Sequence, residues 1–406
     1  MISMVYDSGD LSLKDMLQPV VAAEDALARL DDRVGRKGDF GDVVNHRSRE
    51  GLLRENEGWI ARSHFMEACN ALWLAGELVH VEDLVLHDAR MDIRAPTHEL
   101  TRAHTILRIR RQIATNQSSW ALSPKGIASL RGRGGMDAVI MTVERAPETK
   151  SHSGFDNEEK SQAENDFEDE LARLDALLDR STRLLEQPAV RASAVSETKK
   201  GRGGEHSASA EATPDGDPLV YDPDWDEDAR LERWFAVHDR TRDLPPLLAA
   251  AVIWDAWEDI EPLQHQHWLG PMLVSAMLRE RGKTKSHLAA FNAGLRTISR
   301  DRRRARDRTT RLIAFLEAVQ VSSAANLKEV ERLSLARMQM ERKLKDRRST
   351  SSLPGMIELI LSRPMVSTAL ISKELKVTQR GALNLVADLG VREMTGRGRY
   401  RAWGIV

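Results

Sequence analysis

The sequence predicts a mainly α-helical protein of more than one domain that ends in three short helices and a β-hairpin. Helix-favouring Ala, Leu, Arg and Glu are abundant, and β-branched alternation is scarce before the last strands. Apolar residues recur at steps of three and four in several separate stretches. The length of 406 residues is enough for two or three domains.

Residues 1–142 are predicted to form an N-terminal helical region. Helical spacing of apolar side chains predicts helices within Glu24–Val34, Trp59–Ala75 and Thr97–Ile113. Between the last two, His80, Asp83 and His87 could share one helix face. A zinc site needs ligands that converge, which spacing alone does not provide. We therefore interpret these three residues as structural and predict no metal.

Residues 143–217 are predicted to be a low-complexity linker, because Ser, Glu, Gly, Ala and Lys dominate both of its ends. An amphipathic helix is embedded at 163–187, where Phe167, Leu171, Leu174, Leu178 and Leu185 follow helical steps. Such a stripe can dock on the protein's own core, which we favour, or form a short coiled coil for dimerisation.

Residues 218–346 are predicted to form a central helical domain. The acidic run Asp222–Asp228 can start a helix, since negative charge is favourable at a helix N-terminus. Leu244–Ala251 and Met272–Arg281 predict buried helices. Arg300–Arg311 holds seven Arg and two Asp, which we interpret as a solvated helix with partly paired charges. Phosphate binding by these arginines is the alternative.

Residues 353–406 are predicted to form a winged helix-turn-helix. The elements, in chain order, are helices at Met356–Leu361, Ser367–Leu375 and Gln379–Leu389, then strands at Val391–Thr395 and Arg399–Ile405. Ser367 and Thr378 are placed to cap the second and third helices, and Gly390 to end the third. Because the apolar pattern of this module looks self-contained, we expect it to fold alone.

The third helix of this module is predicted to read DNA. Ala382, Val386 and Leu389 would pack inward, which leaves the opposite face free. Gln and Asn can read adenine, Arg can read guanine, and an apolar side chain can contact a thymine methyl group. The predicted DNA-binding residues are Thr378, Gln379, Arg380, Leu383 and Asn384 on the helix, with Arg397, Arg399 and Arg401 on the hairpin.

The charge of the chain is distributed unevenly. Residues 354–406 hold 8 Lys and Arg against 4 Asp and Glu, although the whole chain carries a net charge of −2. A basic module of this kind suits phosphate contacts. Cys69 is the only cysteine, so an intramolecular disulfide and a cysteine-based metal cluster are both excluded.

The sequence gives no sign of secretion or of a membrane segment. The N-terminus lacks a basic region followed by an apolar stretch, and the longest apolar run, Leu247–Trp254, is too short to span a bilayer. We expect a cytoplasmic protein that binds no cofactor and does not associate with a membrane.

Several motifs resemble a family of uncharacterised rhizobial proteins, many of them plasmid-borne, that carry a domain of unknown function before a C-terminal helix-turn-helix. The resemblance covers nearly the whole chain apart from the linker. Its motifs are Leu86–Leu100, Glu261–Gly270, Lys376–Arg380 and Gly396–Arg401. The family implies DNA binding by the last segment and lends no activity to the rest.

A more distant resemblance links residues 244–346 to Fic proteins, helical enzymes that transfer AMP to hydroxyl groups. Ile260–Leu263 and Leu269–Pro271 stand where the Fic motif would begin and end, and Ala314–Val319 resembles a later Fic helix. Glu261 replaces the histidine that acts as general base, and Gln266 and Trp268 replace glycines that bind phosphate. The resemblance therefore implies a degenerate Fic-like domain with no catalytic residue.

The sequence favours a DNA-binding protein and transcriptional regulator that binds double-stranded DNA as a homodimer, since one winged helix makes few contacts. Two alternatives stay open: a Fic-like enzyme or toxin-like effector with an accessory helix-turn-helix, and a non-catalytic scaffold for protein interactions. His265 and His267 could face one ligand, but we interpret both as structural.

Overall fold

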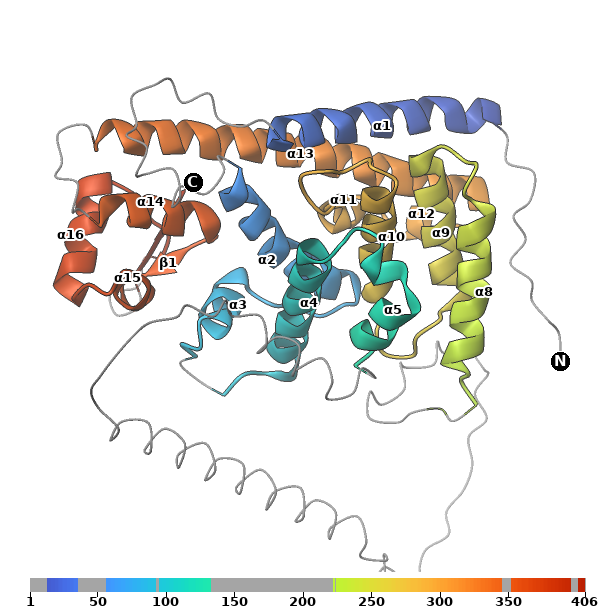
Figure 1. The fold of residues 1–406 in the computed structure, drawn as a ribbon, viewed down its shortest axis with the longest axis horizontal. Helices are drawn as coiled ribbons and strands as arrows, with labels where there is room; N and C mark the ends of the chain where they lie inside the picture. The colour runs from blue at the N-terminus through green and yellow to red at the C-terminus, as the bar shows by residue number, and fades with distance from the viewer. Residues whose placement is uncertain are drawn as a thin grey trace, which may run out of the picture. The chain divides into compact units, whose positions relative to one another are not determined.

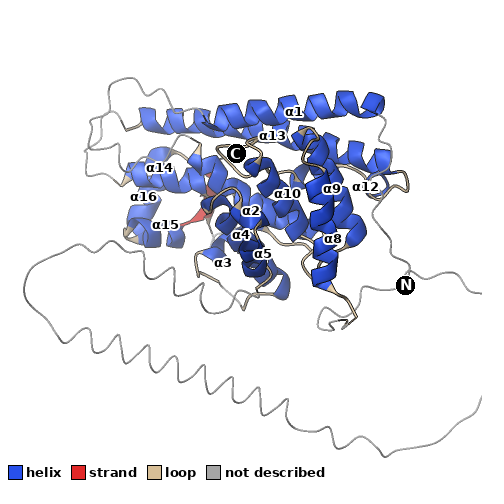
Figure 2. Cartoon of the chain, turned by 45° about the vertical axis from the view of Figure 1, so that its right-hand side comes forward, coloured by secondary structure: helices blue, strands red, loops and turns tan. Residues whose placement is uncertain are grey.

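A computed structural model describes residues 13–35, 56–92, 95–132, 222, 224–344, 352–395 and 401–405. These residues form α-helices and one small antiparallel sheet near the C-terminus (Figures 1 and 2). The prediction of a mainly α-helical protein is confirmed. The helix predicted at 163–187 lies outside the described residues.

The N-terminal region contains the helices predicted for it. They are α1 (Leu13–Gly35), α2 (Glu57–Leu74), α3 (Val81–Asp88), α4 (His98–Thr115), the short 3-10 helix η2 (Trp120–Leu122) and α5 (Pro124–Leu130). The polar stretch between α2 and α4 is itself helical, as α3. The Nδ1 of His87 there donates a hydrogen bond to the Asp92 carboxylate, 2.8 Å away, which is a local structural contact.

The central region contains α8 (Glu227–Arg240), α9 (Pro246–Ile260), α10 (Leu269–Glu280), α11 (Asn292–Thr297), α12 (Arg300–Arg303) and α13 (Arg308–Arg342). The acidic run starts α8 as predicted, because the Asp226 side chain accepts the Ala229 N–H at 3.0 Å. None of the helices in the described ranges is long and apolar enough to cross a membrane.

The prediction of one solvated helix over Arg300–Arg311 is wrong. Helix α12 ends at Arg303, and Asp307 instead caps α13 by accepting the Thr310 N–H at 2.8 Å. A capping aspartate prefers extended backbone, so it separates the two helices.

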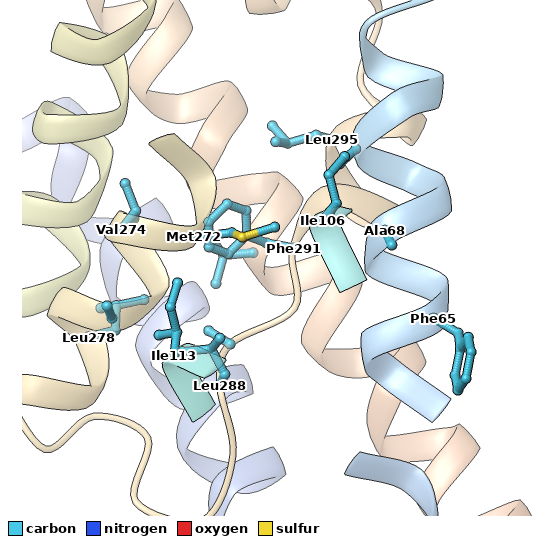
Figure 3. Packing of buried hydrophobic residues seen from close by; sticks show 14 of the residues in the cluster. Phe65, Ala68, Ile106, Ile113, Met272, Val274, Leu278, Leu288, Phe291 and Leu295 are labelled. Atoms are coloured by element: carbon cyan, nitrogen blue, oxygen red, sulfur yellow. The ribbon is translucent and has the colours of Figure 1, made fainter. Parts of the chain in front are cut away.

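Helix α13 joins the N-terminal and central regions into one core. Helix α1 lies beside it in Figure 1, and Arg33 donates a hydrogen bond to the Ser334 hydroxyl at 2.8 Å. The buried residues of α1 recur at steps of three and four: Met16, Val20, Ala23, Leu27, Leu30 and Val34. Figure 3 shows the same core deeper inside, where Phe65, Ile106 and Met272 belong to α2, α4 and α10.

Buried charged side chains hold the loop between α10 and α11. Arg110 of α4, which is 1% exposed, donates hydrogen bonds to the carbonyl oxygens of Leu288 and Ala289, both at 2.8 Å. Glu67 of α2 accepts the backbone N–H of Asn292, and its carboxylate lies 4.0 Å from the Arg110 guanidinium. Burial raises the pKa of Glu67 despite these partners. The N-terminal helices therefore fix a loop of the central region.

The C-terminal module consists of α14 (Leu353–Ser362), β1 (Val366–Ser367), α15 (Thr368–Leu375), α16 (Gln379–Leu389), β2 (Arg392–Glu393) and β3 (Ala402–Gly404). The strands form an antiparallel sheet in the order β1-β3-β2, with Val366 opposite Trp403 and Arg392 opposite Gly404.

The module is docked on α2 and α13. A Cβ atom at Gly58 of α2 would lie 2.9 Å from the Leu361 Cβ of α14, so the missing side chain allows the two helices to approach. Arg337 of α13 makes a two-pronged ion pair with Glu358 of α14, at 2.6 and 2.7 Å. The expectation of a self-contained apolar pattern is therefore corrected, because α14 shares its buried face with the helical body.

Arg62 of α2 is the most heavily bonded side chain at this junction. It donates to the carbonyl oxygens of Arg363 and Pro364, which follow α14, at 2.8–3.1 Å, and pairs with Glu329 of α13 at 3.2 Å. Burial lowers the pKa of Arg62 to about 10, a value that leaves it charged at neutral pH.

We predict that Arg110→Met lowers the free energy of unfolding by about 3–5 kcal/mol, because Glu67 would stay buried without its charge partner. Denaturant unfolding of the whole chain measures this. Arg108→Ala, on the exposed face of the same helix, should change stability by less than about 0.5 kcal/mol. If the two variants lower the free energy of unfolding by the same amount, apolar contacts alone hold the loop.

We predict that Arg62→Ala loosens the module. Loss of its charged hydrogen bonds should raise amide exchange in α14 about tenfold to a hundredfold while exchange in α4 stays unchanged. Hydrogen exchange followed by mass spectrometry resolves the two helices. Arg332→Ala is the matched control, because Arg332 pairs with the same Glu329 at 2.6 Å but makes no hydrogen bond to the described residues of the module. Protection of α14 at the parent level in Arg62→Ala would contradict the docking role.

Candidate nucleic-acid interface

The two helices of the predicted turn are capped as the sequence indicates. Ser367 accepts the Leu370 N–H at 3.2 Å, and Thr378 accepts the Gly381 N–H at 3.1 Å. Lys376 ends α15 in the left-handed conformation, with φ of 52°, and only Val377 separates it from the cap of α16. This sharp connection sets the direction in which α16 leaves α15.

Helix α16 has one buried and one exposed face. Ala382, Val386 and Leu389 are buried against the rest of the module, as the helical spacing predicts. Gly390, with φ of 60°, ends the helix in the left-handed conformation that glycine adopts without strain.

The exposed face carries the side chains predicted to read bases. Gln379, Arg380 and Asn384 are exposed, and Leu383 between them leaves 40% of its surface in solvent. Within the described ranges Arg380 makes no ion pair, so its guanidinium is available to a ligand. Leu383 lies four positions after Gln379 and three after Arg380, and Asn384 lies four after Arg380. Side chains at these spacings are neighbours on a helix surface, so the four side chains form one continuous surface with an apolar residue in it.

The hairpin is only partly described. Strands β2 and β3 pair antiparallel after α16, in the order expected for a wing. Arg397 and Arg399 lie outside the described residues, so their predicted role stays a prediction. Arg401 is exposed and donates to the Glu393 carboxylate at 2.6 and 3.0 Å. This ion pair raises the pKa of Arg401 and lowers that of Glu393.

The pairing of Arg401 changes what the hairpin can offer to a phosphate. Its charge is already balanced by Glu393, whereas Arg392 on β2 is exposed and has no ion pair within the described residues. Lys376, in the turn before α16, is exposed as well. Lys376 is not among the predicted site residues, although its position between the two helices was a signal for it.

Helix α16 is tied to the helical body at its C-terminal end. Lys343, which follows α13, donates a hydrogen bond from Nζ to the Leu389 carbonyl oxygen at 2.6 Å. A cation is favourable at this end of a helix, where carbonyl groups lack partners. The body and the exposed face of α16 are therefore linked through one short contact.

The other candidate sites have structural explanations. Arg308 and Arg311 pair with the buried carboxylate of Asp255, at 3.3 and 2.5 Å, and Arg302 pairs with Glu317 at 2.6 Å. Three of the seven arginines are thus paired with the protein's own acids, which weakens a phosphate-binding interpretation for those three.

The segment that resembles the Fic motif serves packing. The backbone of His267 accepts the Trp257 indole N–H at 3.1 Å, and a Cβ atom at Gly270 would lie 2.4 Å from the Trp257 ring. Glu261 ends α9 in the left-handed conformation, with φ of 46°. Gly270 is therefore needed for the close approach of α10 to a tryptophan ring.

Two family models match parts of the chain. Residues 219–345 match a family model described as a protein of unknown function, DUF1612, and residues 353–406 match a model described as an HTH DNA binding domain. The match over the central region lends no support to the Fic resemblance.

One relative aligns with almost the entire chain. It is the uncharacterized protein y4cF of Sinorhizobium fredii, which is 43% identical over 99% of this chain and 100% of its own length. The chain therefore belongs to the same rhizobial family as y4cF, and it combines a DUF1612 region with a C-terminal helix-turn-helix DNA-binding domain.

Proposed function

We propose that this protein binds double-stranded DNA through α16 and acts as a transcriptional regulator in the cytoplasm. The observation that carries the proposal is the exposed face of α16, where Gln379, Arg380 and Asn384 surround a solvent-exposed leucine. Polar side chains of these types can make paired hydrogen bonds with base edges in the major groove.

In this proposal, α16 reads bases and the flanking basic residues grip the backbone. Arg380 lies in the first turn of α16, the end that recognition helices present to the groove. Lys376 precedes α16 and Arg392 follows it, so both can contact phosphates beside the groove. Arg397 and Arg399 would add to this grip from the hairpin, as a wing does.

A single module of this size makes few contacts with DNA. Specific binding is usually reached when a dimer reads two half-sites about one helical turn apart. We therefore propose a homodimer. The helical body would supply the dimer contact and, through Lys343 and the Arg62 junction, would fix the direction of α16.

We also propose that the central region does not transfer AMP. A carboxylate at Glu261 cannot readily replace a histidine base beside a triphosphate, because both groups are negative. Gly270, the glycine retained near the end of the motif, is packed against Trp257. Incubation with labelled ATP and magnesium tests this, and transfer that disappears in Glu261→Ala would contradict it.

The proposal predicts different effects for two arginines of the module. Arg380→Ala should cost about 1–3 kcal/mol at a preferred site and blur its sequence preference, because a base contact is lost. Arg399→Ala should weaken binding to all sequences alike and lower the salt dependence by about one counterion, because a phosphate contact is lost.

Titrations of the full chain with matched and scrambled DNA, at several salt concentrations, measure both effects. Arg108→Ala, on the exposed face of α4, serves as the control and should bind like the parent. The proposed interface would be refuted by parent-like binding of both module variants.

A further inference from the structure

The outer face of α13 carries an exposed stripe that the packing of the body does not use. Val321, Leu335 and Met338 leave 44%, 52% and 49% of their surfaces in solvent. Ala324, Lys328 and Glu331 between them are also exposed. The six residues recur at steps of three and four, and we refer to them as the α13 stripe.

The α13 stripe lies opposite the buried side of the helix. Val330, Leu333 and Arg337 are buried against the body, and they alternate along α13 with the stripe residues. Spacing of this type is the pattern by which one helix packs against another. Within the described residues, neither Lys328 nor Glu331 has an ion-pair partner.

The order of residues in the stripe is self-complementary about the point between Glu329 and Val330. Lys328 and Glu331 are equally distant from this point, and so are Ala324 and Leu335, and Val321 and Met338. If a second α13 runs antiparallel across the first, each Lys328 meets a Glu331 of the other copy. The apolar ends then cover one another.

We propose that the α13 stripe is a dimer interface at which two copies of this chain pair through antiparallel α13 helices. A two-fold interface must be self-complementary, so that one residue contacts a second and the second contacts the first in return. The α13 stripe meets this condition in both charge and apolar character. The inference deepens the proposed function, because it names the contact that makes the homodimer.

The pairing also gives a suitable separation for the two modules. From the midpoint of the stripe to the end of α13 at Arg342 the helix rises about 19 Å, so the two helix ends lie about 38 Å apart. Lys343 bonds the end of α16 directly beyond this point. One turn of DNA, the usual spacing of half-sites, is about 34–36 Å. The antiparallel pair therefore spans a distance of the right order.

Charge exchange on the full chain tests the pairing. Sedimentation equilibrium should show that Lys328→Glu and Glu331→Lys each weaken dimerisation about tenfold, because two attractive pairs become repulsive. The double variant Lys328→Glu/Glu331→Lys should dimerise like the parent, and so should a mixture of the two single variants. In a parallel pair like would face like in the parent and in each single variant alike, so the charge reversals would exchange one repulsive pair for another and would not weaken dimerisation in this way.

The apolar part of the stripe gives a second test. Leu335→Gln should also weaken dimerisation, and Leu78→Gln, at a leucine that is 69% exposed far from α13 in sequence, should not. Both positions are exposed, so neither substitution is expected to unfold the chain. A parent protein that is monomeric at all concentrations would overturn the proposal, as would a dimer that tolerates every stripe variant. The second result would favour the predicted helix at 163–187 as the contact.

The test separates this inference from the proposed function. If the stripe is wrong but DNA binding depends on Arg380, the regulator proposal stands and the interface fails. If the charge exchange restores dimers but Arg380→Ala leaves DNA binding unchanged, the interface stands and the DNA-binding face fails.

Discussion

The arrangement of the whole body depends on how the buried Arg110 holds the loop after α10. Its guanidinium bonds two successive carbonyl groups, and Glu67 receives a backbone N–H from the start of α11. Buried carbonyl and amide groups are costly without partners. These partners come from helices more than a hundred and seventy residues earlier in the chain. Residues that precede the region matched by the DUF1612 model therefore supply hydrogen-bond partners for some of the buried polar groups of that region.

Helix α13 connects the body to the module and fixes the position of one relative to the other. It packs along α1, pairs through Arg337 with Glu358 of α14, and leads to Lys343, which bonds the last turn of α16. A helix is stiff over this length, so the exposed face of α16 has a direction fixed by the body. The helix-turn-helix is thus attached to the body by buried contacts as well as by the chain.

Local rules predicted the module well because its signals are local. Ser367, Thr378 and Gly390 act at the ends of their own helices, and the buried residues of α16 follow one helical period. Long-range contacts were not predictable from one sequence. Arg110 looks like any other arginine in a helix of mixed charge, and its burial depends on a loop far along the chain. The same holds for Arg62, whose partners lie about 300 residues away.

The number of arginines was a poor guide to where an anion could bind, and the reason is electrostatic. An arginine that already faces a carboxylate has little charge left to attract a phosphate, and displacing its partner costs the pair it has. Arg308 and Arg311 face Asp255, and Arg401 faces Glu393. Arg380, by contrast, stands exposed beside amide side chains on a helix whose other face is buried. An arginine without an acidic partner on an exposed helix face, such as Arg380 among the described residues, is therefore a better guide to an anion site than the density of arginines in the sequence.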